Sequence, residues 1–206
     1  MKKSIGIFVL IVASMFVLPT WSVAGISPDK LVEETVQEVI DIINEDEAIK
    51  SGDRERMLDL VETKIIPHFD FTRMTRLAMG KNWRSADEAQ QAVLVEEFRT
   101  LLVRTYSNTL TSYSDETINV TPIDDIDGET ETMVRTQIIQ GQGRQSVPID
   151  YNMEKHASGW KVYDVTVAGV SLVTNYRSSF DSQIRRNGVD GLIKTLSSKN
   201  DSLEGK

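Results

Sequence analysis

The sequence predicts an α+β domain in which a four-stranded antiparallel meander lies between two helical sections. Apolar residues recur at helical spacing up to about residue 113 and at strand spacing over residues 116–167. Short glycine-containing turns at residues 124–128, 141–143 and 157–159 join the strands, and connections this short make neighbouring strands antiparallel. We expect the N- and C-terminal helices to cover one face of the sheet.

Residues 1–24 have the pattern of a secretory signal peptide. Two lysines precede a short apolar run from Ile5 to Leu18, and Ser22 to Ala24 form a small-x-small cleavage site. We therefore predict one domain over residues 25–206 and expect it in the bacterial periplasm. The chain has no cysteine, which excludes disulfides and a lipid-modified N-terminal cysteine.

The charge of the chain argues against two classes of partner. The formal net charge is −8, and the predicted signal carries two lysines and no acids, so the mature domain is more acidic still. Nucleic acid is not expected as a partner, because its phosphates require a basic surface. Permanent binding to an anionic membrane is not expected either, whereas transient contact with a membrane complex remains open.

The first helix is predicted to begin at Ser27-Pro28, because proline is favoured at the first helical position. It has an acidic outer face and one apolar stripe. A second helix is expected over residues 54–66. The stripe of the first helix comprises Leu31, Val32, Val36, Val39, Ile40 and Ile43.

A short apolar helix is predicted at a corner between Pro67 and Gly80. Pro67 ends the preceding helix, Asp70 caps the new one, and Gly80 is placed to end it. Ser85 to Glu88 has the pattern of a capping box that opens a long helix over about 86–113. Its inner face is expected to comprise Ala89, Val93, Phe98, Leu101, Leu102, Thr105, Tyr106, Thr109 and Tyr113.

Four strands are predicted at residues 116–123, 131–140, 147–153 and 160–167. The second and fourth carry apolar residues on both faces. These faces could form an ordinary core or enclose an apolar cavity between sheet and helices, and periodicity does not separate the two. After Gly169 we expect a helical section that breaks at Asn187-Gly188 and ends in a frayed tail from Ser197 to Lys206.

The sequence offers little of the chemistry that an enzyme needs. His68 and Asp70 could be two metal ligands, but even a catalytic zinc has three protein ligands, so packing and capping are favoured and no metal site is predicted. His156 lies in a predicted turn and is expected to be solvated. The sequence contains no phosphate-binding glycine loop, nucleophile elbow or dinucleotide fingerprint. We therefore predict no enzymatic activity and no cofactor.

Two long blocks resemble a known family. They are PHFDFTRMTRLAMGKNWRSA, continuing into EEFRTLLVRTYSNTL, and WKVYDVTVAGVSLVTNYRSSFDSQIRRNGVDGLIKTL. Both are similar to the MlaC or toluene-tolerance family of periplasmic phospholipid-binding proteins, and with the signal peptide and element order the resemblance spans nearly all of the mature chain. Leu94 stands where members often carry an aromatic residue, and residues 116–153 match only in pattern.

The resemblance implies a phospholipid carrier with an apolar lipid cavity between sheet and helices. Such a carrier exchanges lipid with an outer-membrane lipoprotein–porin complex and with an inner-membrane ABC transporter that holds an MCE-domain subunit. Val170, where the last strand gives way to the closing helix, is expected at the cavity rim. The residues expected to contact lipid are Met74, Leu77, Trp83, Phe98, Leu101, Leu102, Tyr106, Val134, Ile138, Ile149, Tyr151, Val162, Val165, Val170, Leu172, Val173 and Tyr176.

A basic cluster at the corner comprises Arg73, Arg76, Lys81 and Arg84, and we expect some of these side chains to contact a partner or a lipid phosphate. Two alternative functions remain. One is an isomerase-like enzyme on a cone-shaped α+β fold, for which Asp164 and Tyr151 are the available acid–base candidates. The other is a ligand-free adaptor that bridges two membrane complexes.

Overall fold

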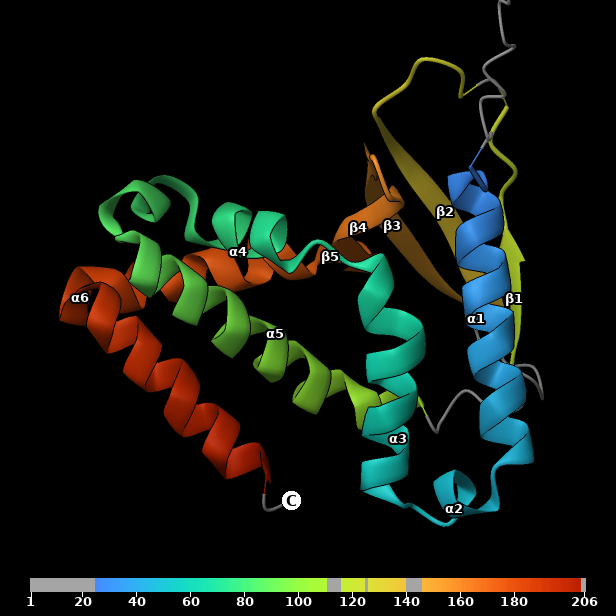
Figure 1. The fold of residues 1–206 in the computed structure, drawn as a ribbon, viewed down its shortest axis with the longest axis horizontal. Coiled ribbons are helices and arrows are strands. Elements are labelled where there is room, and N and C mark those ends of the chain that lie inside the picture. Colours follow the sequence, from blue (N-terminus) through green and yellow to red (C-terminus); the bar gives the residue numbers. More distant parts are fainter. Residues whose placement is uncertain (1–24, 111–115, 125, 140–145, 205–206) are drawn as a thin grey trace, which may run out of the picture.

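The computed structural model describes residues 25–110, 116–124, 126–139 and 146–204 of the chain. The predicted signal peptide, the end of the long helix at Tyr113 and the predicted turn at 141–143 lie outside these residues. Figure 1 shows one group of helices beside an antiparallel sheet and a second group extending away from it. The first group is α1 (Pro28–Glu45), α2 (Glu47–Lys50) and α3 (Arg54–Leu60), and the second is α4 (Phe71–Met79), α5 (Glu88–Leu110) and α6 (Leu172–Glu204).

The sheet has five strands in sequence order, each antiparallel to the next, where the sequence predicted four. The additional strand arises because Ala168 (φ 49°) and Gly169 (φ 83°) turn the chain back, so that Val170 pairs with Val167 before α6 begins. The strands are β1 (Thr117–Val120), β2 (Glu131–Ile139), β3 (Val147–His156), β4 (Gly159–Val167) and β5 (Val170–Ser171).

Strand β4 has one residue more than its partner at Tyr163. Asp164 pairs with Asn152 and Val162 pairs with Met153, so Tyr163 has no position opposite it on β3. A bulge of this kind shifts the side-chain alternation by one residue. Val162 and Val165 therefore belong to the same buried face, and the two-faced pattern predicted for this strand results from the bulge.

One face of the sheet is covered and the other is largely open. Val32 of α1 joins Val134 and Met153 in the buried cluster on the covered face. On the opposite face of β2, Met133 and Ile139 are 38% and 47% exposed, so only one of the two apolar faces of this strand is buried. The C-terminal helix contributes to the covered face only through its first residue, Leu172.

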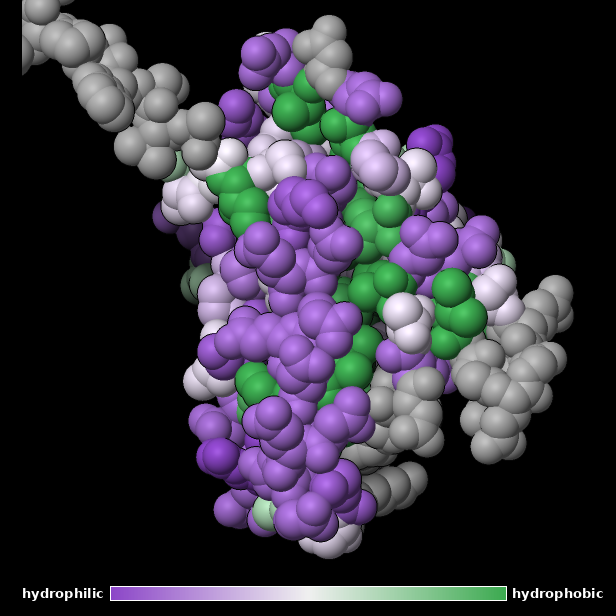
Figure 2. Space-filling model, turned by 90° about the vertical axis from the view of Figure 1, so that its right-hand side faces the viewer, coloured by the Kyte–Doolittle hydropathy of each residue, from purple (hydrophilic) through white to green (hydrophobic). Residues whose placement is uncertain are grey.

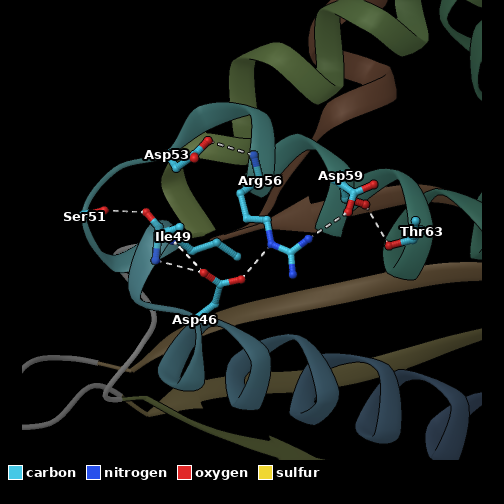
Figure 3. Close-up of polar contacts among 8 residues, drawn as sticks. Asp46, Ile49, Ser51, Asp53, Arg56, Asp59 and Thr63 are labelled. Atoms are coloured by element: carbon cyan, nitrogen blue, oxygen red, sulfur yellow. Dashed lines mark hydrogen bonds and ion pairs between the residues drawn. The ribbon is translucent and has the colours of Figure 1, made fainter.

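A network of polar contacts fixes the corner that joins α1 to α3 (Figure 3). The Asp46 carboxylate accepts hydrogen bonds from the backbone N–H groups of Ala48 and Ile49, which caps α2. Its other oxygen lies 2.8 Å from Nε of Arg56. Asp53 caps α3 by accepting from the N–H of Arg56 at 3.0 Å. The corner thus turns α3 back along α1.

The helices α4, α5 and α6 pack together around a separate core. Phe98 of α5 lies 5.0 Å from the Tyr176 ring and 5.1 Å from the Phe180 ring, centroid to centroid. The helix α5 begins later than predicted, because Asp87 and Gln90 form the reciprocal capping box. Val93, predicted on the inner face, is 42% exposed. Ala89, predicted on the same face, is also exposed, and Leu94 is fully buried instead.

The last helix is bent but continues to the end of the described chain. Gly188 has φ 71° inside α6, which agrees with the predicted break. The tail predicted to fray is helical to Glu204, because other elements satisfy its polar groups. Asn200 donates to Glu97 of α5, and Arg54 donates to the carbonyl of Glu204.

Candidate functional site

A cavity of about 300 Å³ lies between the covered face of the sheet and the helices. Its first wall is the apolar stripe of α1, which recurs at helical spacing and therefore presents one face. The α1 residues that line it are Leu31, Val32, Thr35, Val36, Val39, Ile40 and Ile43. The outward side of the same helix is charged, and the surface on this side of the molecule is largely hydrophilic with separate hydrophobic groups (Figure 2).

The second wall follows α3 and contains an unusual turn. The chain forms a π-helical turn, η1 (Val61–Ile65), before the 3₁₀ turn η2 (Ile66–His68). Such wide turns are rare and occur frequently at functional sites. The N–H of Ile66 bonds to the carbonyl of Val61, five residues back. Val61, Ile65 and Ile66 all line the cavity, so the wide turn adds a residue to the wall.

The sheet and α5 complete the enclosure. Strands β2, β3 and β4 contribute the covered-face residues Ile138, Ile149, Tyr151, Met153, Val162, Val165 and Val167. The C-terminal end of α5 contributes Leu102, Val103, Tyr106, Ser107 and Leu110, and the corner and the start of α6 add Phe69, Phe71, Met74 and Leu172.

Polar groups are sparse in the lining and come from Thr35, His68, Tyr106, Ser107 and Tyr151, all other lining residues being aliphatic, Phe or Met. Burial lowers the pKa of His68, and the Lys161 ammonium lowers it further against the opposing effect of Glu38. His68 is therefore favoured in its neutral form. A space this apolar suits hydrocarbon rather than a charged ligand.

The residues predicted to contact lipid divide into two groups. Those that line the cavity are Met74, Leu102, Tyr106, Ile138, Ile149, Tyr151, Val162, Val165 and Leu172. A second set belongs to, or packs against, the core of α4, α5 and α6 and does not line the cavity: Leu77, Trp83, Phe98, Leu101, Val173 and Tyr176. A buried helix face has the same sequence pattern whether a side chain or a cavity lies opposite.

Val134 and Val170 are also outside the cavity lining, for different reasons. Val134 is fully buried in the sheet cluster. Val170 was expected at the rim but is 57% exposed on β5, because the turn at Ala168 and Gly169 sends it outward. No residue of the α1 or η1 walls was predicted as a site residue. The α1 stripe was visible as an apolar face, whereas nothing in the pattern marked the π turn.

The predicted basic cluster separates into one paired and three exposed side chains. The Arg73 guanidinium lies 2.8 Å from Glu131 and 2.6 Å from Glu154 and 3.6 Å from the centroid of the Tyr163 ring. Its side chain is only 13% exposed, so it ties α4 to the sheet and is not free for a phosphate. Arg76, Lys81 and Arg84 are exposed.

The histidines and acids considered for chemistry have other neighbours. Asp70 caps α4 by accepting from the N–H of Arg73, as predicted. His156, expected to be solvated, lies 3.5 Å from Asp70 and 3.4 Å from Glu154. These three side chains could offer three ligand atoms within 4.8 Å of one another, but the Glu154 oxygen that lies near His156 is also the one paired with Arg73.

The acid–base candidates of the enzyme alternative are not brought together in the cavity. Tyr151 lines it, but Asp164 does not. The Asp164 carboxylate accepts from the Ser171 hydroxyl at 2.6 Å and from the N–H of Val173 at 3.1 Å. The Asp164 carboxylate therefore stabilises the start of α6 by accepting these hydrogen bonds.

Among the described residues, no helix is both long and apolar enough to span a bilayer.

Comparison with known proteins gives consistent matches. The chain is 23% identical over 198 residues to the intermembrane phospholipid transport system binding protein MlaC of Haemophilus influenzae, covering 95% of this chain and 92% of that protein. It is 26% identical over 192 residues to the toluene tolerance protein ttg2D of Pseudomonas putida, covering 93% and 86%.

A solved structure matches as well. The phospholipid-binding protein of Ralstonia solanacearum, determined in complex with a phospholipid, superposes with a TM-score of 0.80 at 32% identity, over 87% of this chain and 99% of that one. The family model described as MlaC protein matches residues 33–198. The resemblance found in the sequence is thereby confirmed, and the chain belongs to the MlaC family.

Proposed function

We propose that this chain is a periplasmic carrier that holds a phospholipid in the cavity with its acyl chains inside and its head group near solvent. The observation that carries the proposal is the apolar cavity walled by α1, η1, the sheet and the end of α5. Two acyl chains contain about 28 methylene groups, and at roughly 0.8 kcal/mol each their removal from water offers roughly 20 kcal/mol. A few polar lining groups are therefore sufficient for lipid binding, because burial of the acyl chains supplies most of the free energy.

The proposed route is between an outer-membrane lipoprotein–porin complex and an inner-membrane ABC transporter with an MCE-domain subunit. A ligand whose acyl chains gain so much free energy from burial leaves slowly into water. Its release therefore requires a partner that opens the cavity. The acidic net charge of the chain disfavours lasting adhesion to anionic lipid. The exposed Arg76, Lys81 and Arg84 are the proposed contacts to these complexes.

Lipid extraction tests the proposal directly. Protein purified without detergent is extracted with organic solvent, and mass spectrometry is expected to find phospholipid near one mole per mole of protein. The delipidated protein is then incubated with vesicles containing fluorescent phospholipid, separated by gel filtration, and expected to carry the label. A stable protein that yields no phospholipid in either experiment would contradict the proposal and favour the adaptor alternative.

A further inference from the structure

The hydroxyl of Ser107 is a buried polar group without a partner in the cavity wall. Ser107 is 2% exposed and lines the cavity. Its Oγ has no hydrogen-bond partner among the described residues. Buried side-chain polar atoms in native proteins are nearly always hydrogen-bonded, so an exception calls for an explanation such as a ligand.

Three other hydroxyls on helices of this chain satisfy themselves locally. Thr63, Thr75 and Thr195 each donate to the carbonyl four residues earlier, at 2.7–2.8 Å, which is the usual bond for such a residue. Ser107 makes no such bond, although the carbonyl of Val103 stands at the same spacing. Its hydroxyl therefore remains available to a group that is absent from the protein itself.

The surroundings of Ser107 indicate what kind of group this is. Val103 and Leu110, one helical turn to either side, line the same cavity, so an ionic group would be poorly solvated there. Tyr106, the preceding residue, also lines the cavity and is 39% exposed. Ser107 therefore lies close to the level at which the wall meets solvent.

We infer that Ser107 donates a hydrogen bond to an ester carbonyl oxygen of the bound phospholipid, an inference that rests on the proposed function. The ester carbonyls are neutral acceptors located between the apolar chains and the charged phosphate, which matches an apolar site near the cavity opening. The serine hydroxyl reaches them by rotation about χ1, without movement of the helix. The contact would select ester-linked over ether-linked lipids.

Thr105 provides a matched control on the same helix. Its Oγ1 is also buried and without a partner among the described residues, but Thr105 does not line the cavity. Ser107→Ala and Thr105→Val each remove one such hydroxyl from α5. Only the first is expected to change lipid selection.

The experiment measures the affinity of delipidated wild type, Ser107→Ala and Thr105→Val for a diester phosphatidylcholine and for the diether lipid of equal chain length. Loss of one hydrogen bond to the ligand is expected to weaken diester binding by Ser107→Ala about three- to tenfold. Diether binding should be unchanged, and Thr105→Val should bind both lipids as the wild type does.

The outcomes separate this inference from the proposed function. Equal weakening of both lipids by Ser107→Ala, or no weakening of either, overturns the ester contact while leaving the carrier function standing. Failure of the wild type to bind either lipid overturns the proposed function itself. Ser107→Cys, which retains the side-chain shape but has a weak donor, serves if the alanine variant does not fold and should show the same selective loss.

Discussion

Replacement of Val165 by phenylalanine distinguishes an open cavity from a filled core, because the two predict opposite changes in the free energy of unfolding. Val165 lies on β4, is 9% exposed and lines the cavity. Phenylalanine adds four carbons, which at about 0.8 kcal/mol per buried methylene sets an upper limit of about 3 kcal/mol. Allowing for strain, we expect lipid-free Val165→Phe to gain about 1–2 kcal/mol, whereas overpacking a filled core costs about 1–3 kcal/mol.

Val134 supplies a control in the same row of the sheet. Both valines pair with Tyr151 in register, Val134 from β2 and Val165 from β4. Val134 is fully buried but does not line the cavity, so its environment is a filled core. Val134→Phe is therefore expected to lose about 1–3 kcal/mol.

The assay is urea unfolding of the delipidated proteins, supported by thermal melts. For a domain of this size 1 kcal/mol corresponds to about 2–4 °C in Tm, so the two variants should shift in opposite directions. Val165→Phe should also carry less co-purified lipid, because the added ring occupies the space of acyl carbons. Equal destabilisation by both substitutions would refute the reasoning, since it would mean that Val165 faces packed side chains.

Four further predictions concern the rim, the histidine and the basic cluster. Val170→Glu should fold with an unchanged Tm, because Val170 is 57% exposed; reduced lipid in extracts would support the predicted contact at the rim, and normal lipid would contradict it. The pKa of His68 is lowered in the folded state, chiefly by burial, so the unfolded state binds its proton at higher pH. Stability in urea should therefore fall as pH drops from about 7 to 5, and a His68→Gln variant with the same slope would argue against this. Arg73→Glu should cost about 1–3 kcal/mol in urea because it removes the partner of Glu131 and Glu154. Arg76→Glu with Arg84→Glu should leave stability unchanged yet slow lipid transfer, and normal transfer at low salt would count against a docking role.

Much of the fold follows from the sequence because its signals are local. The period of apolar residues changes twice, near residue 115 and after Gly169, and the cap at Asp70 and the break at Gly188 mark positions where the structure turns or bends. The errors arise where a single residue alters the period. The extra residue at Tyr163 made β4 resemble a strand buried on both faces, and the turn before Val170 produced a fifth strand of two residues.

The candidate site was less predictable, because burial alone does not show what lies opposite a side chain. Phe98 and Leu102 both belong to the buried face of α5. Phe98 meets the aromatic rings of α6, whereas Leu102 lines the cavity. This difference depends on how far the sheet lies from α5, which no local pattern records. The π turn at Val61–Ile65 could not be predicted for the same reason, since its two apolar residues stand at the ordinary helical spacing of four.

The separation of cavity and core predicts that the protein remains folded when the cavity is empty. The cluster around Phe98, Phe180 and Leu192 holds α4, α5 and α6 together, and of its buried residues only Met74 and Leu102 line the cavity. Arg73 joins this helical group to the sheet through Glu131, Glu154 and the Tyr163 ring, on the side of the sheet away from the cavity. Loss of ligand therefore removes contacts from the α1, η1 and sheet walls while the packing of the helical group persists. A carrier needs this division, because it must give up its ligand without unfolding.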